Sequence, residues 1–558
     1  MYRLQSVNID ILIWTACVKN VKIKNNVNCS FCIHWEELFM VKFITAAEAA
    51  RLIPDGATVG VAGMGLSGWP EEVAVAIADC YKETGHPCNL TMKQGSAMGD
   101  WKERGMTRLG YEGLVTKWAA AHIGSAFAMN DLVRANKMAC HCLPQGVIVN
   151  LWREIAAHRP GLLTKVGLGT FVDPRLEGGK MNAVTTEDLV ELVNFQGEEY
   201  LFYKAFPLHV ALLRGTTADE DGNITFEKEG PINEGLVVAE AAHNSGGIVI
   251  VQVEYTAKRG TMHPKEVKIP GTLVDYVVVA TDKNACWQTE GVYYEPAFAG
   301  NLKKPLNALP KVPLCDRKII ERRCAMELKK GNVVNLGVGI PADVASVVAE
   351  EGCTDDITLT TEIGAFGGVP AALPNFGSSY NAQACIDHGS MFDFYDGGGC
   401  DVAVLGLAQA DEQGNINVSK FGPRLTGPGG FINISQNSKK VLFAGTFMAK
   451  AKIAIENGGI RIVEEGKGKK FLKEVEQVTF SGKYAAKGNQ EILYITERCV
   501  FRLSHEDRLV LVEVAPGIDI EKDILAHMDF KPEIAENVKV MDGAIFAEEW
   551  GELKEMME

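Results

Sequence analysis

An internal repeat limits the folds open to this 558-residue chain more than any other feature of its sequence. Residues 55–63 form a short apolar run bounded by glycines, and this run leads into an apolar-periodic stretch after Pro70. Residues 331–339 have the same arrangement and lead into a similar stretch at Pro341. Each copy predicts a strand, a glycine-rich turn and a helix with proline at its first position.

A second pair of matching segments follows in the same order. Residues 218–224 and 410–416 both read Ala-Asp-Glu-x-Gly-Asn-Ile, which predicts a turn ahead of a strand. The first half places many more residues between its two landmarks than the second half does. The two halves are therefore related but not equivalent.

Apolar runs without alternation indicate the class of sheet. Residues 247–253 and 402–405 are almost wholly apolar, which is typical of parallel strands buried on both faces by helices. The sequence predicts two similar α/β domains with largely parallel sheets, at 40–293 and 315–558. Residues 294–314 contain four prolines and little periodicity, which indicates an ordered linker.

Charge and hydropathy exclude several classes of function. The net charge of −15 argues against nucleic acid or an anionic membrane as the main partner. The apolar stretch at residues 9–18 is too short to cross a bilayer.

The cysteine pattern bears on the compartment and on metal binding. Fourteen cysteines without regular spacing suggest reduced thiols and a cytoplasmic protein. Cys29 and Cys32 with His34, and the run 140–142, resemble fragments of metal sites. Neither has the second pair of ligands that structural zinc requires, so no metal is expected.

The segment 361–370 carries the strongest chemical signal. It places Glu362 at the end of a β-rich run and surrounds it with glycines, which let backbone N–H groups approach a bound carbonyl. A carboxylate can attack a thioester if the protein supplies desolvation and oxyanion donors. Residues 334–341 end a second strand in a Gly-x-Gly turn, so two strand ends converge on one cleft. The plain alternative is an exposed acid beside a glycine-rich turn.

These motifs together resemble the family I coenzyme A transferases, and in particular the single-chain enzymes that act on acetate and propionate. The resemblance runs from about Met40 to the C-terminal region. Besides 361–370 it is carried by five segments: 337–341, 143–146, 167–175, 178–180 and 427–431.

The resemblance implies a fold of two similar α/β domains with the active site at their interface. It assigns Glu362 as the catalytic nucleophile. The Gln145 side-chain amide and the backbone N–H groups of the 337–339 and 429–430 turns are expected to donate to the oxyanion. The residues expected to bind coenzyme A are Gly337, Val338, Gly339, Gly364, Gly367, Gly368, Gly429 and Gly430.

The implied reaction is the reversible transfer of coenzyme A from a short-chain acyl-CoA to a free carboxylic acid. It proceeds through a glutamyl anhydride and a glutamyl-CoA thioester. Coenzyme A is then a substrate and covalent intermediate, and no cofactor is bound permanently. The resemblance also implies a homo-oligomer, a dimer or tetramer. The preferred acid stays open, because one methylene changes selectivity by only about 1–3 kcal/mol.

Two other functions remain open at this point. A short-chain acyl-CoA hydrolase on the same fold would let water intercept the glutamyl intermediate, and acceptor dependence distinguishes it from a transferase. A non-catalytic metabolite-binding protein could keep the glycine turns but would have no use for a nucleophile.

The first 39 residues differ from the rest in composition, and the globular pattern begins only near Met40. Thr45 and Glu48 then have the spacing of a capping box at the start of a helix. We expect the native protein to begin at Met40, with residues 1–39 an upstream extension that does not pack; the competing interpretation is a partner-binding arm. N-terminal sequencing of the native protein tests this, and a mature chain that begins near residue 1 would contradict it.

Overall fold

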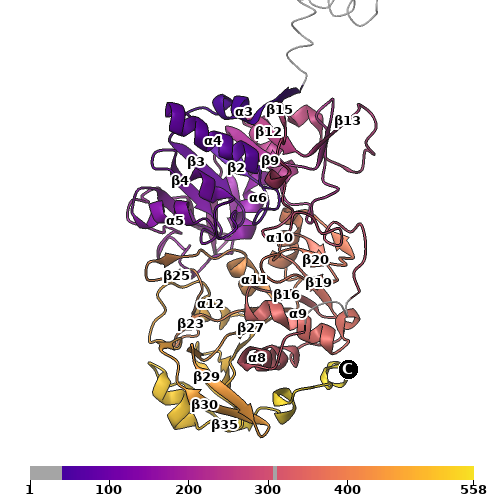
Figure 1. Cartoon of the computed structure of the whole chain (residues 1–558). Helices are drawn as coiled ribbons and strands as arrows, with labels where there is room; N and C mark the ends of the chain where they lie inside the picture. The colour runs from indigo at the N-terminus through magenta and orange to yellow at the C-terminus, as the bar shows by residue number, and fades with distance from the viewer. Residues whose placement is uncertain (1–40, 306–310) are drawn as a thin grey trace, which may run out of the picture. The chain divides into compact units, whose positions relative to one another are not determined.

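A computed structural model describes residues 41–305 and 311–558 (Figure 1). The expected N-terminal extension and the centre of the expected linker lie outside the described residues. The described chain forms one compact unit by its contacts, so the domain boundaries at 293 and 315 stay a prediction.

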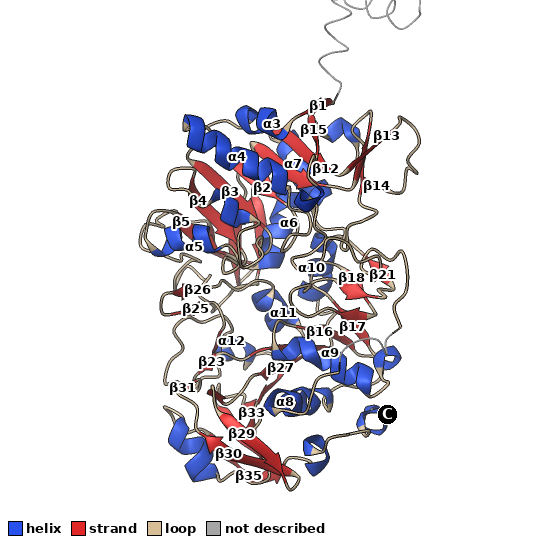
Figure 2. Ribbon diagram, viewed as in Figure 1, coloured by secondary structure: helices blue, strands red, loops and turns tan. Residues whose placement is uncertain are grey.

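The first half is built on an eight-stranded sheet in which all neighbours are parallel. Helix α7 packs on β2, β9 and β12 of this sheet (Figure 2). In spatial order the strands are β1 (Lys42–Ile44), β15 (Tyr276–Val279), β12 (Ile248–Val253), β9 (Val210–Arg214), β2 (Thr58–Val61), β3 (Leu90–Gln94), β4 (Val115–Ala120) and β5 (Ala139–Cys142). The helices are α3 (Ala46–Leu52), α4 (Glu71–Thr84), α5 (Phe127–Arg134), α6 (Gln145–Ala156) and α7 (Gly235–Asn244).

The second half is built on a ten-stranded mixed sheet whose central strands, from β17 to β32, are parallel. In spatial order the strands are β21 (Ala384–Cys385), β18 (Ala365–Phe366), β17 (Thr358–Thr360), β16 (Val333–Leu336), β22 (Val402–Gly406), β27 (Lys440–Ala444), β32 (Glu491–Ile495), β33 (Cys499–Leu503), β34 (Leu509–Val514) and β35 (Glu533–Val540). The helices are α8 (Asp316–Ala325), α9 (Ile340–Glu350), α10 (His388–Asp396), α11 (Phe431–Asn437), α12 (Gly482–Ala485) and α13 (Leu553–Met557).

Both halves also contain smaller sheets. They contain β6 (Gly161–Thr164), β7 (Val190–Phe195) and β8 (Glu198–Lys204); β10 (Thr217–Asp219), β11 (Ile224–Thr225), β13 (Tyr255–Ala257) and β14 (Val267–Ile269); and the pairs β19 (Val369–Pro370) with β20 (Ser379–Tyr380), β23 (Gln409–Ala410) with β24 (Ile416–Asn417), β25 (Lys420–Phe421) with β26 (Arg424–Leu425), β28 (Met448–Ala449) with β31 (Gly468–Lys469), and β29 (Lys452–Glu456) with β30 (Gly459–Glu464).

The repeat seen in the sequence is also present in the hydrogen bonds. The Asp219 carboxylate accepts from the backbone N–H groups of Asp221 and Asn223 and from the Asn223 amide. The Asp411 carboxylate makes the same three bonds within its own turn, 411–415. Since short Asp-to-backbone bonds set the turn, the shared sequence yields the same turn in both halves.

The expected elements form with small shifts at their ends. Strands β12 and β22 are buried along nearly their whole length, as unalternated apolar runs predict. Thr45 and Glu48 make the expected capping box of α3. Pro70 is the N-cap of α4 and Pro341 the second residue of α9, so the predicted helix starts are each off by one residue.

Helix α6 joins the two halves. It contacts α10 and α11 of the second half. The backbone N–H of Gly146 donates to the Asn433 side chain at 3.0 Å, and Arg153 pairs with both Asp387 and Asp393. Since α6 starts at Gln145, these contacts hold the expected oxyanion donor against the second half.

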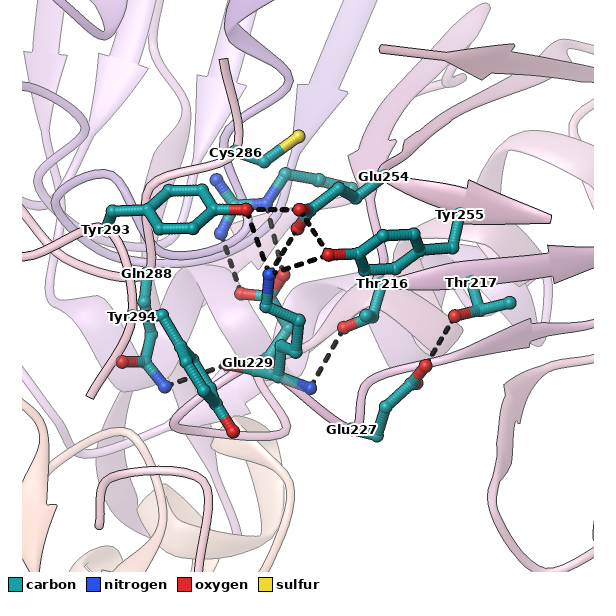
Figure 3. A network of polar contacts seen from close by, with 12 residues as sticks. Thr216, Thr217, Glu227, Glu229, Glu254, Tyr255, Cys286, Gln288, Tyr293 and Tyr294 are labelled. Atoms are coloured by element: carbon teal, nitrogen blue, oxygen red, sulfur yellow. Dashed lines mark hydrogen bonds and ion pairs between the residues drawn. The ribbon is translucent and has the colours of Figure 1, made fainter. Parts of the chain in front are cut away.

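A polar network in the first half anchors the segment that follows β15 (Figure 3). The Lys228 ammonium donates to Glu254 at 2.6 Å and to the Tyr293 hydroxyl at 3.0 Å. Beside it, the Arg214 guanidinium pairs with Glu229 at 2.7 Å, with side-chain exposures of only 2% and 6%. A buried guanidinium depends on its partner, because water cannot replace the lost carboxylate.

We therefore expect Glu229→Ala to lower the free energy of unfolding by about 3–5 kcal/mol in chemical denaturation. The matched control is Glu220→Ala, which removes the partner of Lys258 in an exposed pair. The control should cost at most about 1 kcal/mol, since water screens exposed pairs. Equal losses in the two variants would contradict the role given to burial.

Candidate functional site

A cavity of about 300 Å³ is lined by residues of both halves. Ser96 and Gln145 line it from the first half, and Glu362 and Gly430 line it from the second. Its volume is at the lower end of the range for small-molecule sites. The cavity therefore joins the two residues that the sequence predicts to be catalytic.

Glu362 lies in the tight turn between β17 and β18. The backbone N–H of Thr361 donates to Ala365 and that of Gly364 donates to Thr361. Gly364 has φ +113°, and a Cβ there would lie 2.0 Å from the Ile386 carbonyl oxygen, so only glycine fits. A Cβ on Gly430 would lie 2.5 Å from Glu362 Oε2, so this glycine leaves room for the carboxylate at the start of α11.

Burial raises the pKa of Glu362, while the neighbouring His388 ring and the Gln145 amide act in the opposite direction. The carboxylate thus gives up part of its hydration and gains polar contacts that hold it. Loss of hydration favours attack, because a less solvated carboxylate is a better nucleophile.

Behind Glu362, a buried chain of hydrogen bonds crosses between the halves. Gln145 Nε2 lies 2.9 Å from His388 Nε2, and His388 Nδ1 lies 2.7 Å from Glu234 Oε2. For the amide to donate, His388 Nε2 must be unprotonated, so the ring proton sits on Nδ1 and is donated to Glu234. The Ser96 hydroxyl donates to Gln145 Oε1 at 3.3 Å. The Gln145 amide is thereby held from both sides.

The eight residues expected to bind coenzyme A divide into two sets. Four line the cavity: Gly337, Val338, Gly429 and Gly430. Gly339, Gly364, Gly367 and Gly368 do not line it, and all four have positive φ, which glycine tolerates in tight turns. The part of all eight residues in binding coenzyme A stays a prediction.

Two of the backbone donors expected at the oxyanion are already engaged. The N–H of Gly337 donates to Val404 at 2.8 Å, and the N–H of Gly429 donates to Ala121 at 2.8 Å. The N–H of Gly430 has no backbone acceptor among the described residues. The N–H groups of Val338 and Gly339 likewise have no backbone acceptor there. Gly430 is the unengaged donor that lies directly against the Glu362 carboxylate, since a Cβ on it would be 2.5 Å from Oε2.

Sequence reasoning missed His388, Glu234 and Ser96. Glu234 and His388 are 154 residues apart and fully buried, and neither lies in a recognisable motif. Glu234 is the N-cap of α7 and His388 the first residue of α10, and α6 packs on both of these helices. Tertiary packing alone therefore brings the pair together.

Three further features of the described residues concern disulfides, metal-ligand clusters and membrane-spanning helices. Their cysteines are all free, and no group of three or more His, Cys, Asp or Glu side chains there is arranged to hold a metal ion. None of the helices formed by residues 41–305 and 311–558 is both long enough and apolar enough to cross a membrane.

Comparison with known proteins identifies the family. The profile of the coenzyme A transferase family matches residues 43–280. Caffeate CoA-transferase of Acetobacterium woodii is 76% identical over 523 residues, which cover 93% of this chain and all of the relative. The chain belongs to the coenzyme A transferase family. Acetate CoA-transferase YdiF of Escherichia coli O157:H7 is 45% identical over 510 residues, 91% of this chain and 95% of the relative.

The fold of this coenzyme A transferase matches a solved structure over nearly its whole length. The acyl-CoA transferase YdiF of E. coli O157:H7, in a thioester complex with CoA, superimposes with a TM-score of 0.86 at 42% identity. The match covers 94% of this chain and 98% of that one. The expected α/β fold and the expected enzyme class, a CoA-transferase, are confirmed.

The raised pKa of Glu362 predicts a pH-dependent gain in stability on substitution. Above that pKa the folded protein holds a poorly hydrated charge, whereas below it the carboxyl is neutral and resembles glutamine. Glu362→Gln should therefore stabilise the protein by about 1 kcal/mol at pH 8, and the gain should shrink as the pH falls through the raised pKa toward the ordinary glutamate value.

Thermal unfolding between pH 5 and pH 8 measures this difference, and Glu83→Gln on an exposed turn of α4 is the matched control. A gain that grows as the pH falls would have the wrong sign for a carboxyl with a raised pKa.

Proposed function

We propose that this CoA-transferase uses Glu362 as its nucleophile and Gln145 as the main oxyanion donor. The observation that carries the proposal is the position of the Glu362 carboxylate, which lines a cavity between the two halves of the sequence and has lost part of its hydration. The cavity brings it beside an amide that is fixed by buried hydrogen bonds.

In the proposed reaction, a Glu362 oxygen attacks the acyl-CoA carbonyl and the C–S bond breaks. This gives a glutamyl anhydride and coenzyme A thiolate. The thiolate then attacks the glutamyl carbonyl, releases the first carboxylate and leaves a glutamyl-CoA thioester. An acceptor carboxylate attacks this thioester, and the same two exchanges in reverse yield the new acyl-CoA and restore Glu362.

Each exchange passes through an oxyanion, and each fixed donor contributes roughly 3–4 kcal/mol to lowering the barrier. One N–H of the Gln145 amide is used by His388, which leaves the other for the oxyanion. The N–H of Gly430 is the second proposed donor. His388 and Glu234 act as positioning residues, because His388 hydrogen-bonds the Gln145 amide and Glu234 hydrogen-bonds His388.

The names of the relatives bear on the acyl group. The sequence led us to expect short-chain acids, and the acetate enzyme at 45% identity is consistent with that range. The much higher identity to the caffeate enzyme supports an acyl range that extends to aromatic propenoic acids. We propose this wider range, with a homo-oligomeric assembly, dimer or tetramer, in the cytoplasm.

Mass spectrometry tests the mechanism directly. Protein mixed with acetyl-CoA and no acceptor should carry a CoA-sized adduct on the peptide that contains Glu362, and added propionate should discharge it. Glu362→Ala and Glu362→Asp should form no adduct, and Gln145→Ala should form it about 10²–10³-fold more slowly.

Glu83→Gln should behave as the unsubstituted protein. Steady release of coenzyme A without an adduct would contradict the proposal and indicate a hydrolase. The absence of both an adduct and turnover would indicate a binding protein.

A further inference from the structure

Part of the cavity wall consists of polar atoms that the folded chain leaves without partners. His122 Nδ1, Ser125 Oγ and Thr426 Oγ1 are buried and have no hydrogen-bond partner within residues 41–305 and 311–558. All three residues line the cavity that holds Glu362. Each buried unpaired group costs about 1–3 kcal/mol, so three in one wall indicate a ligand that pairs with them.

These three residues form one cluster although they come from both halves. A Cβ built on Gly124 would lie 3.1 Å from His122 Cε1 and 3.2 Å from Thr426 Cγ2, so the two side chains flank the same glycine. The Ser125 carbonyl accepts from the Trp101 backbone N–H at 3.2 Å. The Trp101 ring stands edge-on to the His122 ring at 5.6 Å.

A carboxyl group completes the polar wall. Glu290 lines the cavity, and no other side chain in the described part of the protein hydrogen-bonds its carboxyl. Its oxygens lie against Gly65, where a Cβ would be 2.3 Å from Oε1. Burial raises the pKa of Glu290 to about 8, so near neutral pH the carboxyl is largely protonated and both donates and accepts.

The segment that carries Glu290 is fixed from both sides. The Gln288 amide donates to the Lys228 carbonyl at 2.8 Å, and Tyr293 contacts the Lys228 ammonium, as Figure 3 shows. Directly before Glu290 in the chain, the Thr289 hydroxyl donates to the Asn375 side chain at 2.6 Å. Glu290 therefore sits at the tip of an anchored loop and not on a free one.

The chemistry of this wall favours an uncharged group on the part of the ligand that contacts it. Burial lowers the pKa of His122 to about 4, so its ring is neutral at physiological pH. Among the described residues that line the cavity, the only Lys or Arg is the exposed Arg424. A second carboxylate would therefore meet an acid and no buried cation. Apolar and aromatic side chains complete the lining: Met64, Trp101, Leu373 and Phe376.

A short series of contacts connects the polar wall to the reacting group. Ser96 donates to Gln145, the expected oxyanion donor, and the next residue, Ala97, accepts from the Gly65 backbone N–H at 2.6 Å. Gly65 in turn touches Glu290. This continuous path runs from the reacting carbonyl at Glu362 to the polar wall.

We propose that His122, Ser125, Thr426 and Glu290 form a subsite that binds the ring hydroxyl groups of a hydroxylated aromatic carboxylic acid. The inference rests on the proposed function, because it places the acid's carboxyl at Glu362. Neutral donors and acceptors suit phenolic hydroxyls, and the aromatic and apolar lining suits a flat ring.

The test compares acceptors that differ only in ring hydroxyls. With acetyl-CoA as donor, kcat/KM is measured for 3,4-dihydroxycinnamate, cinnamate and butyrate. We expect at least about a 10-fold preference for the dihydroxy acid over cinnamate. Thr426→Val and Ser125→Ala should each reduce that preference by about 3- to 10-fold and leave the value for cinnamate within about 2-fold. Thr261→Val, at an exposed threonine, is the matched control and should change neither value.

Two results would overturn the subsite. One is equal kcat/KM for the dihydroxy acid and cinnamate in the unsubstituted protein. The other is a rise in KM for acetyl-CoA in Thr426→Val that is the same with every acceptor, which would assign the cluster to the pantetheine arm. The Glu362 adduct is measured on the same samples, so an enzyme that forms the adduct without the preference refutes only the subsite.

Discussion

The buried pair of Glu234 and His388 is the interaction on which the rest of the site depends. Both side chains are fully buried, and they come from opposite halves of the chain. A buried carboxylate is tolerable only with a close hydrogen-bonding partner, so the halves must meet in one register for the pair to form. That register also sets the Gln145 amide beside Glu362. The geometry proposed for catalysis is thus tied to the packing of the two halves.

Two glycines near Glu362 leave space that any side chain would fill. Gly430 leaves room for the Glu362 carboxylate at the start of α11, and Gly364 lets the β17–β18 turn close against Ile386. The turn presents the carboxylate to the cavity that both halves line. Such a site is costly to the folded state, because a charge there has lost hydration that the unfolded chain would restore.

The proposed roles divide the residues that line the cavity into two chemically different groups. Glu362 and Gln145 are the proposed machinery that any carboxylic acid would use. The neutral groups of His122, Thr426 and Glu290 are the proposed contacts to whatever the acyl chain carries. Relatives in the same family that act on different acids need differ only in the second group, since the reacting carboxyl is common to all of them.

The sequence alone determined the α/β class and the duplication, and it singled out Glu362 as the candidate nucleophile. These follow from local patterns: buried apolar runs in β12 and β22, matched Asp-Gly turns at 219 and 411, and glycines around Glu362. It also placed Gln145 in the site, but only through resemblance to a family. The tertiary structure decided which glycines line the cavity and that the N–H groups of Gly337 and Gly429 are already engaged. It alone joined Glu234 to His388 and left His122, Ser125 and Thr426 facing one space. Such contacts arise between residues that are distant in the chain, and no local pattern encodes them, because burial and pairing depend on how the two halves pack.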